Sequence, residues 1–588
     1  MANTENRSYE FGPFRLLPNE RLLLRDGQAV SLTPKVFDTL LVFVENSGRL
    51  LTKDELMKLI WPETTVEEGN LSQNIFVLRK TLGERPPEQR YIVTIPLRGY
   101  RFITKVREVE SETGTAGFPK TEARQSKRSF VTSLAVLPFK TLGEESDELQ
   151  IGAGIADALI TKLSRINRII VRPTTAVLKY SSARQDPVAA GKEQRVDAVL
   201  DGVVQRLGPR IRVGVQLIRV DNQETLWADR FEDQFTDVFA LQDSISEQLA
   251  RVLIPELSRE ERDRLFKNQT ESMEAHALYI KGRYFWDQRT EPGLQKGLAL
   301  AQQMIRLDPA FSLAHVGVAD SYILLAEYLF LSPTYAFPKA QAAASEALKL
   351  DSSLPEAHAS LAEVALFYDW NWCEAEARYL RAIALNPHYA SAHHWYAWLH
   401  LTQGRFEEAR AKLRHAQHLD PGSLTINTVL GLPDYYLRNY DRAISQYQQI
   451  LQMNSEFPQA YYYLGSALTQ KGLYREAVAA FKKVLSIEYR QQTYALLAYT
   501  YAMLGQKSRA RAILKGLDDL SAQRYVSSYL KAIVYAGLGQ SDEAFLQLEA
   551  AYAERAAWLV FLKVDPFLER LRADPRFPAM VRRVGFVS

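Results

Sequence analysis

Apolar residues in the first hundred positions fall into short alternating runs, followed by longer runs with helical spacing. Between Tyr9 and Ser31, short apolar pieces are separated by turns that contain Gly and Asn, a pattern that predicts strands. Thr33 followed by Pro34 predicts the N-cap and first residue of a helix. Thr52 and Glu55 form a capping-box pattern, so we expect a second helix to begin directly after Thr52.

A third helix is expected over residues 70–82, and its apolar spacing gives it one buried side. That side is a stripe at helical spacing: Leu71, Ile75, Leu78 and Leu82. The opposite side presents Gln73, Phe76, Val77 and Lys80, with Arg79 on the flank. Gly83 ends the helix, and two β-like runs around Leu97–Gly99 predict a hairpin with Arg98 near its tip.

Residues 130–255 change to a pattern typical of an α/β domain. A buried-type strand, SLAVLPF, precedes an amphipathic helix, GAGIADALITKLSRI. Strand-like segments follow in RIIVRP, DAVLDGVVQRL, RIRVGVQLIRV and LWADRFE, and a closing helix is expected near residues 238–253. The segment therefore predicts a sheet packed against helices.

The C-terminal half repeats itself at a nearly constant period. One series of small residues recurs at intervals of 33 or 34 residues: Ala375, Ala409, Ala443, Ala477, Ala510 and Ala544. Helix-ending residues form a second series, with a first interval of 43 residues and then intervals of 34 or 35, so we expect an insertion near residues 331–336: Asp308, Asp351, Asn386, Asp420, Asn454 and Glu488. Turn glycines precede four of the alanines: Gly404, Gly472, Gly505 and Gly539. A small residue at a fixed point lets the second helix of each pair approach the first, so the period predicts stacked helix pairs.

This period resembles that of tetratricopeptide repeats, with GRFEEA, NYDRAI, GLYREA and GQSDEA matching the turn and second-helix motif. The resemblance implies about seven or eight units across residues 275–558 and capping helices over 559–588. It also implies a concave surface for protein partners. Histidines gather here (His388, His393, His394, His400, His415 and His418), but no carboxylate or cysteine completes a metal set, so we expect packing and no metal.

Composition narrows the class of protein. A chain of 588 residues is too long for a single hydrophobic core. Its net charge of +3 is too small to indicate that the chain as a whole binds nucleic acid. A single cysteine, Cys373, excludes an intramolecular disulfide framework. Neither a signal peptide nor an apolar span is visible, so we expect a cytoplasmic protein with no membrane contact and no cofactor.

Positive charge is concentrated near the predicted third helix and hairpin. Residues 70–105 contain seven Lys or Arg and two acidic residues. A helix that enters a DNA groove and a flanking wing need such charge. The pattern by itself fits a small α+β domain with a solvated basic edge equally well.

The order of elements, with NLSQNIFVLRKTLGE and TIPLRGYRF, resembles the OmpR/PhoB-type winged helix of the ToxR/CadC-like branch over residues 9–105. The resemblance implies that residues 70–82 form the recognition helix in the major groove. It places Arg98 and Tyr100 in the wing beside the minor groove, and Thr52 and Lys53 at a helix N-terminus that binds phosphate. The implied DNA-binding residues on the helix are Asn70, Ser72, Gln73, Phe76, Val77, Arg79 and Lys80.

One departure concerns base preference. Commoner members of the family place arginines in the middle of the recognition helix, where this chain has Phe76 and Val77. Apolar contact with thymine methyl groups is the substitute that these side chains offer. Only eight residues precede the winged helix in this sequence, so we expect no phosphoacceptor domain before it. Residues 106–129 form a polar, Gly- and Pro-containing stretch that predicts a flexible linker.

The middle segment resembles a TolB-like α/β domain, which implies a fold but no chemistry. Gly152-Ala153-Gly154 before a helix could cradle an anion, although a tight entry from strand to helix explains it better. No phosphate-binding loop of the GxxxxGK[ST] type and no nucleophile–base pair is present, so we expect no enzyme.

The predicted fold class is therefore multidomain: an α+β winged helix-turn-helix, an α/β domain and an all-α tetratricopeptide-repeat solenoid. The predicted function is that of a sequence-specific DNA-binding transcriptional regulator. Its expected partners are double-stranded DNA, a protein bound by the repeats, with RNA polymerase as a candidate, and further copies of itself on DNA. The alternatives are a protein-interaction scaffold with a degenerate winged helix, and an enzyme with its site in the middle domain.

Overall fold

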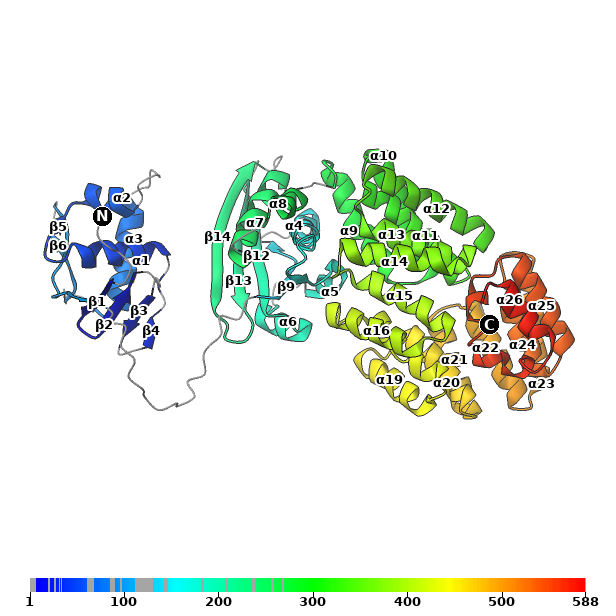
Figure 1. Cartoon of the computed structure of the whole chain (residues 1–588). Coiled ribbons are helices and arrows are strands. Elements are labelled where there is room, and N and C mark those ends of the chain that lie inside the picture. The colour runs from blue at the N-terminus through cyan, green and yellow to red at the C-terminus, as the bar shows by residue number, and fades with distance from the viewer. Residues whose placement is uncertain are drawn as a thin grey trace. The chain divides into compact units, whose positions relative to one another are not determined.

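The chain forms two compact units, Met1–Lys127 and Arg128–Ser588 (Figure 1). The computed structural model describes residues 7–18, 22–25, 28–30, 32, 34–60, 68–84, 90–95, 98–110, 131–141, 146–180, 185–207, 210–234, 238–254, 258–266 and 269–586. The predicted N-cap Thr33 lies outside the described residues. Among the described helices, none combines the length and the apolar character that a membrane crossing requires.

The first unit opens with a five-stranded antiparallel sheet in the order β4-β3-β2-β1-β8. Its strands are β1 (Arg7–Phe11), β2 (Phe14–Leu17), β3 (Leu22–Arg25), β4 (Gln28–Val30) and β8 (Arg107–Glu110). The fifth strand corrects the predicted linker, because residues 107–110 pair with β1 in a register that sets Tyr9 opposite Glu108. The winged-helix unit therefore extends beyond residue 105, and residues 111–130 lie outside the described part.

Three helices and a small sheet complete this unit. The helices are α1 (Pro34–Glu45), α2 (Lys53–Ile60) and α3 (Glu68–Thr81), and β5 (Leu50–Leu51), β7 (Gly99–Phe102) and β6 (Ile92–Ile95) pair in that order. Gly99 has a φ of +139°, and a Cβ placed there would lie 2.0 Å from the carbonyl oxygen of Leu51. Glycine at this position is therefore what lets the hairpin pack directly against β5.

The second unit begins with the predicted α/β domain. Its strands are β9 (Ser133–Val136), β10 (Lys140–Thr141), β11 (Ile170–Val171), β12 (Ala198–Leu207), β13 (Arg210–Arg219) and β14 (Thr225–Gln234). Strands β11, β9 and β12 are parallel, whereas β12, β13 and β14 are antiparallel neighbours. Its helical elements are α4 (Ser146–Leu163), α5 (Thr174–Val177), η1 (Leu178–Tyr180), α6 (Pro187–Gln194), α7 (Val238–Leu253) and α8 (Arg259–Phe266).

The glycines of the predicted anion cradle lie inside α4, because this helix already begins at Ser146. A Cβ on Gly152 would lie 2.1 Å from the carbonyl oxygen of Phe139. The backbone amide of Phe139 also donates a hydrogen bond to the Gly152 carbonyl at 3.3 Å. Gly152 thus permits close packing of α4 on the chain after β9. Both the anion cradle and the tight entry from strand to helix assumed that Gly152 lies before the helix, whereas it lies inside it.

The repeat region is an array of antiparallel helix pairs, as predicted (Figure 1). The pairs are α9 (Met273–Asp287) with α10 (Glu291–Leu307), α11 (Ser312–Glu327) with α12 (Pro333–Leu350), α13 (Pro355–Val364) and η3 (Ala365–Asp369) with α14 (Trp372–Leu385), α15 (Ala390–Gln403) with α16 (Phe406–Leu419), α17 (Leu424–Val429) and α18 (Leu432–Tyr436) with α19 (Tyr440–Met453), α20 (Pro458–Gln470) with α21 (Tyr474–Ile487), α22 (Gln491–Met503) with α23 (Lys507–Ser521), and α24 (Ser528–Leu538) with α25 (Ser541–Ala553).

The predicted signature residues occupy the positions expected of them. All six alanines of the first series are fully buried, and the six helix-ending residues are the C-caps of second helices. The four turn glycines have φ between +78° and +85°. Packing at a fixed small residue and a left-handed turn therefore set the period, as the sequence indicates.

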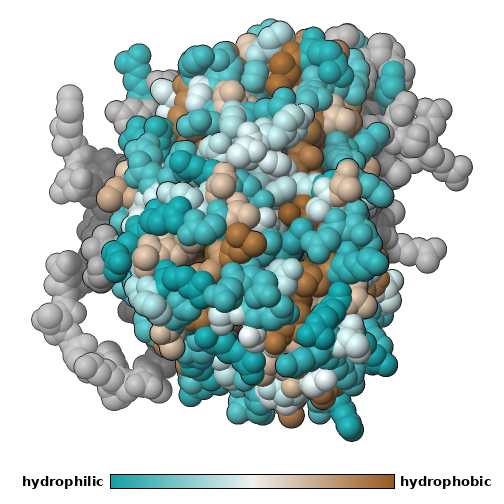
Figure 2. Space-filling model, turned by 90° about the vertical axis from the view of Figure 1, so that its right-hand side faces the viewer, coloured by the Kyte–Doolittle hydropathy of each residue, from teal (hydrophilic) through white to brown (hydrophobic). Residues whose placement is uncertain are grey.

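The C-terminal cap is less helical than predicted. It consists of η4 (Ala557–Phe561) and η5 (Pro566–Leu571), both 3₁₀ turns, and the α-helix α26 (Arg576–Arg583). The surface at this end of the array is mostly hydrophilic, with small hydrophobic patches among the hydrophilic residues (Figure 2). A polar outer face of this kind is what a terminal repeat requires.

The α/β domain is bound to the repeats within the second unit through Arg172. This side chain is 1% exposed and donates hydrogen bonds to the carbonyl oxygens of Gln194 and Arg195 in its own domain, both at 2.9 Å. It also donates to the carbonyls of His418 and Leu419 at the end of α16, at 2.8 and 2.6 Å. The Nδ1 of His388 lies 3.1 Å from the carbonyl of Ile169 and adds a second link.

Candidate nucleic-acid interface

Helix α3 has the buried side that its sequence predicts. Leu71, Ile75, Leu78 and Leu82 are 3% exposed or less and pack into the core of the first unit. On a polar edge of the helix, the Nδ2 of Asn74 donates to the Thr39 hydroxyl of α1 at 3.1 Å. Asn74 therefore positions α3, a role that was not predicted. Its only signal in the sequence is a polar residue beside the apolar stripe.

The opposite side of α3 carries an exposed stripe that we name the α3 stripe: Ser72, Phe76 and Lys80. These residues recur every fourth position, so their side chains lie along one face of the helix. Phe76 is 63% exposed, the largest value among the exposed large apolar side chains that the structure describes in this unit. Val77 is half-buried and packs against the core, and the side chains of Asn70 and Gln73 lie outside the described residues.

The N-terminus of α2 is closed by the predicted capping box. The Thr52 amide donates to Glu55 Oε2 at 2.9 Å, and the Glu55 amide donates to the Thr52 hydroxyl at 3.2 Å. The Thr52 hydroxyl also lies 3.0 Å from Glu55 Oε2, and the hydrogen bonds that the Thr52 amide and hydroxyl donate to this carboxylate, with the Arg49 charge, lower the pKa of Glu55. A phosphate at this helix end therefore competes with the Glu55 carboxylate, and Lys53 is exposed at the same helix end.

Arg79 has a structural role that the sequence did not indicate. Its Nη2 donates to the Ile92 carbonyl at 2.9 Å and to the Thr94 hydroxyl at 2.7 Å, both on β6. Its Nε lies 3.5 Å from the buried carboxylate of Glu84. That carboxylate also accepts a hydrogen bond from the Ile92 amide at 3.0 Å. Arg79 thus fastens α3 to strand β6 of the hairpin.

We expect Arg79→Met to loosen the wing without removing a charge that neutralises phosphate. Removing the two hydrogen bonds and the ion pair of Arg79 should lower the free energy of unfolding of the first unit by about 1–3 kcal/mol. Hydrogen exchange of the full-length protein should show faster exchange in β6, with the salt dependence of DNA affinity unchanged. Lys80→Met is the matched control. It should leave hydrogen exchange in β6 unchanged and reduce the salt dependence of DNA affinity.

The predicted wing is present, and its two named residues differ in exposure. Arg98 is exposed, and its amide donates to the Ile95 carbonyl at 3.0 Å in the turn. Tyr100 is 8% exposed, because it pairs with Thr94 and Leu51 in the small sheet and its ring joins the core. Among the predicted DNA-binding residues whose side chains the structure describes, the exposed ones are therefore the α3 stripe, Thr52, Lys53 and Arg98.

The histidines of the repeats behave as packing residues. His393, His394 and His400 are at most 6% exposed, and burial lowers their pKa values to about 4, 3 and 4. Within the described residues, no group of His, Cys, Asp or Glu is arranged to hold a metal ion.

Comparison with protein families gives a separate result for each part of the chain. Residues 27–102 match the model of the C-terminal domain of transcriptional regulatory proteins, and residues 130–248 match the second domain of HilA/YgeH-like transcriptional regulators. The chain is a transcriptional regulator with an OmpR-type DNA-binding domain. Residues 371–423 and 429–493 of the regulator match the tetratricopeptide repeat model. The TolB-like resemblance of the middle domain is not confirmed, since the matching model is that of HilA/YgeH-like regulators.

The similarity of the regulator to known proteins extends over more than one domain in some relatives. The transcriptional regulator HilA of Salmonella typhi is 25% identical over 443 residues, which are 75% of each chain. The transcriptional activator CadC of Escherichia coli is 32% identical over 104 residues, 18% of the regulator and 20% of CadC. A Rhizobium meliloti protein named "Putative adenylate cyclase 3" is 27% identical over 234 residues, 39% of each chain.

Proposed function

We propose that the regulator binds duplex DNA with the α3 stripe in the major groove and Arg98 of the wing beside the minor groove. The observation that carries this proposal is Phe76, which is 63% exposed on a helix whose other side is fully buried. Such a side chain loses exposed apolar surface when it meets a thymine methyl group. Lys80, on the same stripe, and Lys53, at the N-terminus of α2, supply positive charge for phosphates. Asn70, Ser72, Gln73 and Val77 are the further residues that we place at the groove.

We propose that the repeats bind a protein at the promoter, with RNA polymerase as the candidate, and that copies of the regulator associate on paired half-sites in the cytoplasm. The middle domain then serves as a connector and not as an enzyme. Its packing supports this role, because Gly152 is needed for contact between α4 and Phe139 and not for a phosphate. The match to the protein named as a cyclase covers 39% of each chain, so it does not by itself assign catalysis.

Selection of duplexes from a random library by the full-length regulator tests the proposal. We expect enrichment of a repeated half-site and a steep fall of affinity with salt. In Lys80→Ala and Arg98→Ala, the slope of log affinity against log salt should flatten by about 0.9 for each phosphate that is no longer neutralised. Lys192→Ala is the control, because Lys192 is exposed on α6 in the other unit. No enriched sequence and unchanged slopes would favour a protein scaffold.

A further inference from the structure

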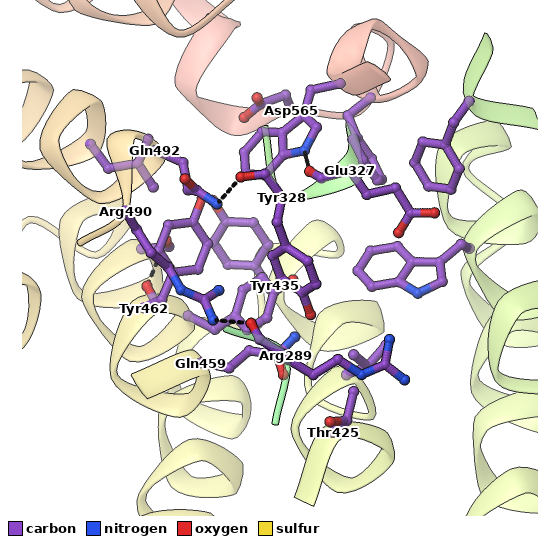
Figure 3. A pocket seen from close by; sticks show the side chains of 18 of the residues that line it. Arg289, Glu327, Tyr328, Thr425, Tyr435, Gln459, Tyr462, Arg490, Gln492 and Asp565 are labelled. Carbon is purple, nitrogen blue, oxygen red and sulfur yellow. Dashed lines mark hydrogen bonds between the residues drawn. The ribbon is translucent and has the colours of Figure 1, made fainter. Parts of the chain in front are cut away.

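The repeats enclose a cavity of about 120 Å³. Aromatic side chains from distant helices form its walls, among them Tyr328 at the end of α11 and Tyr462 of α20 (Figure 3). Trp398 of α15 and Tyr436 of α18 also line it. An apolar cavity of roughly 150 Å³ is known to accept benzene, so this space is of the size of one small ring. Flat walls of this kind favour a planar molecule.

The chain's own C-terminal segment covers the cavity. The indole Nε1 of Trp558 donates to the Glu327 carbonyl at 2.9 Å. The ring of Phe561 lies 5.7 Å from that of Trp398 and 6.3 Å from that of Tyr436. This C-terminal segment thus forms one wall of a partly open chamber within a single chain.

Polar atoms without partners point to a missing occupant. His394 and Gln492 line the cavity and are 6% and 2% exposed. Among the described residues, neither Nε2 of His394 nor Oε1 of Gln492 has a hydrogen-bond partner, whereas the Glu327 carboxyl is hydrogen-bonded to the buried carboxyl of Glu363. Buried polar atoms left unsatisfied are costly and rare, so a cavity with two of them favours a bound polar group.

The charge of the cavity favours an anion. Arg289 lies in the turn between α9 and α10, with its guanidinium 3.7 Å from the centre of the Trp286 ring. Its Nε has no hydrogen-bond partner in the described part of the chain, whereas Arg490 is paired with Glu488. Burial raises the pKa of Glu327, which is hydrogen-bonded to Glu363, to about 7, and burial also raises the pKa of Asp565.

Arg289, His394 and Thr425 also line a second cavity, of about 300 Å³, between the α/β domain and the repeats. The polar end of the aromatic chamber therefore lies where the two cavities meet. We propose that this chamber binds a small aromatic carboxylate, with its ring between the aromatic walls and its carboxylate on Arg289. A ligand in this place contacts the repeats near the junction with the α/β domain, and its binding needs no DNA.

Isothermal titration of the full-length protein with small probes tests the site. Benzoate and phenylacetate are the anionic probes, benzyl alcohol is the neutral control and benzylamine is the cationic control. We expect one anion to bind per chain, with an affinity at least tenfold higher than that of either control. In Arg289→Asn the preference for the anion should disappear, because asparagine keeps the left-handed backbone (φ +55°) but not the charge.

Two further variants make the test specific. Arg555→Asn is the matched control, because Arg555 also has a φ of +55° and stacks on Trp370 but does not line the cavity. It should bind the anions as the native protein does. Ser466→Leu fills the chamber and should abolish binding, with circular dichroism confirming the helical content. Saturable binding of none of the probes, tighter binding of the amine or alcohol, or unchanged binding in Arg289→Asn would overturn the proposal.

Discussion

Phe76→Glu should weaken binding of the selected duplex by about 100-fold, while Phe76→Leu should weaken it by less than tenfold. The glutamate removes an apolar side chain from the groove and places a negative charge next to the phosphates, effects that together amount to about 2–3 kcal/mol. Folding should be unaffected, because Phe76 is 63% exposed. Fluorescence anisotropy with the labelled duplex measures the affinity, and thermal unfolding followed by circular dichroism measures the stability.

The control for this substitution is Leu546→Glu. Leu546 is 67% exposed on α25, so the change adds the same charge at an equally exposed apolar position in the other unit. Its affinity for DNA should equal that of the native protein. Native affinity in Phe76→Glu would mean that the α3 stripe does not face DNA, and the recognition role of α3 would have to be given up.

The sequence predicts those features of the first unit that depend on neighbours along the chain. The buried stripe of α3 and the capping box of α2 are set within a few residues, and the structure confirms both. It does not predict the role of Arg79, because the partners of this side chain on β6 become neighbours only when the hairpin folds back. The same reason explains β8, which pairs with a strand about a hundred residues earlier although its residues lie in the predicted linker.

The repeats are predictable for a different reason. Each pair packs in the same way as the one before, so Ala409 and Gly472 repeat a local rule that periodicity reveals. The aromatic chamber follows no such rule, because Arg289, Glu327 and Gln492 come from different pairs and meet only through the curvature of the array. The fold of the C-terminal segment over this chamber likewise has no signal in the local sequence.

The largest decrease in stability is expected from Arg172→Met. The substitution removes every hydrogen bond from Arg172 to four carbonyl oxygens, two in the α/β domain and two at the end of α16. It also removes the positive charge beside Asp420, a carboxyl whose pKa burial raises to about 6. Leaving such groups unpaired costs about 3–5 kcal/mol.

Because these hydrogen bonds join two domains, Arg172→Met should do more than lower the melting temperature. Differential scanning calorimetry of the native protein should show the α/β domain and the repeats unfolding together, whereas the variant should show the α/β domain melting first. Arg168→Met is the matched control: Arg168 lies close in sequence, is 54% exposed and pairs with Glu261 at 3.0 Å, so its removal costs about 0.5 kcal/mol. Identical calorimetric traces for the two variants would show that the junction does not depend on Arg172.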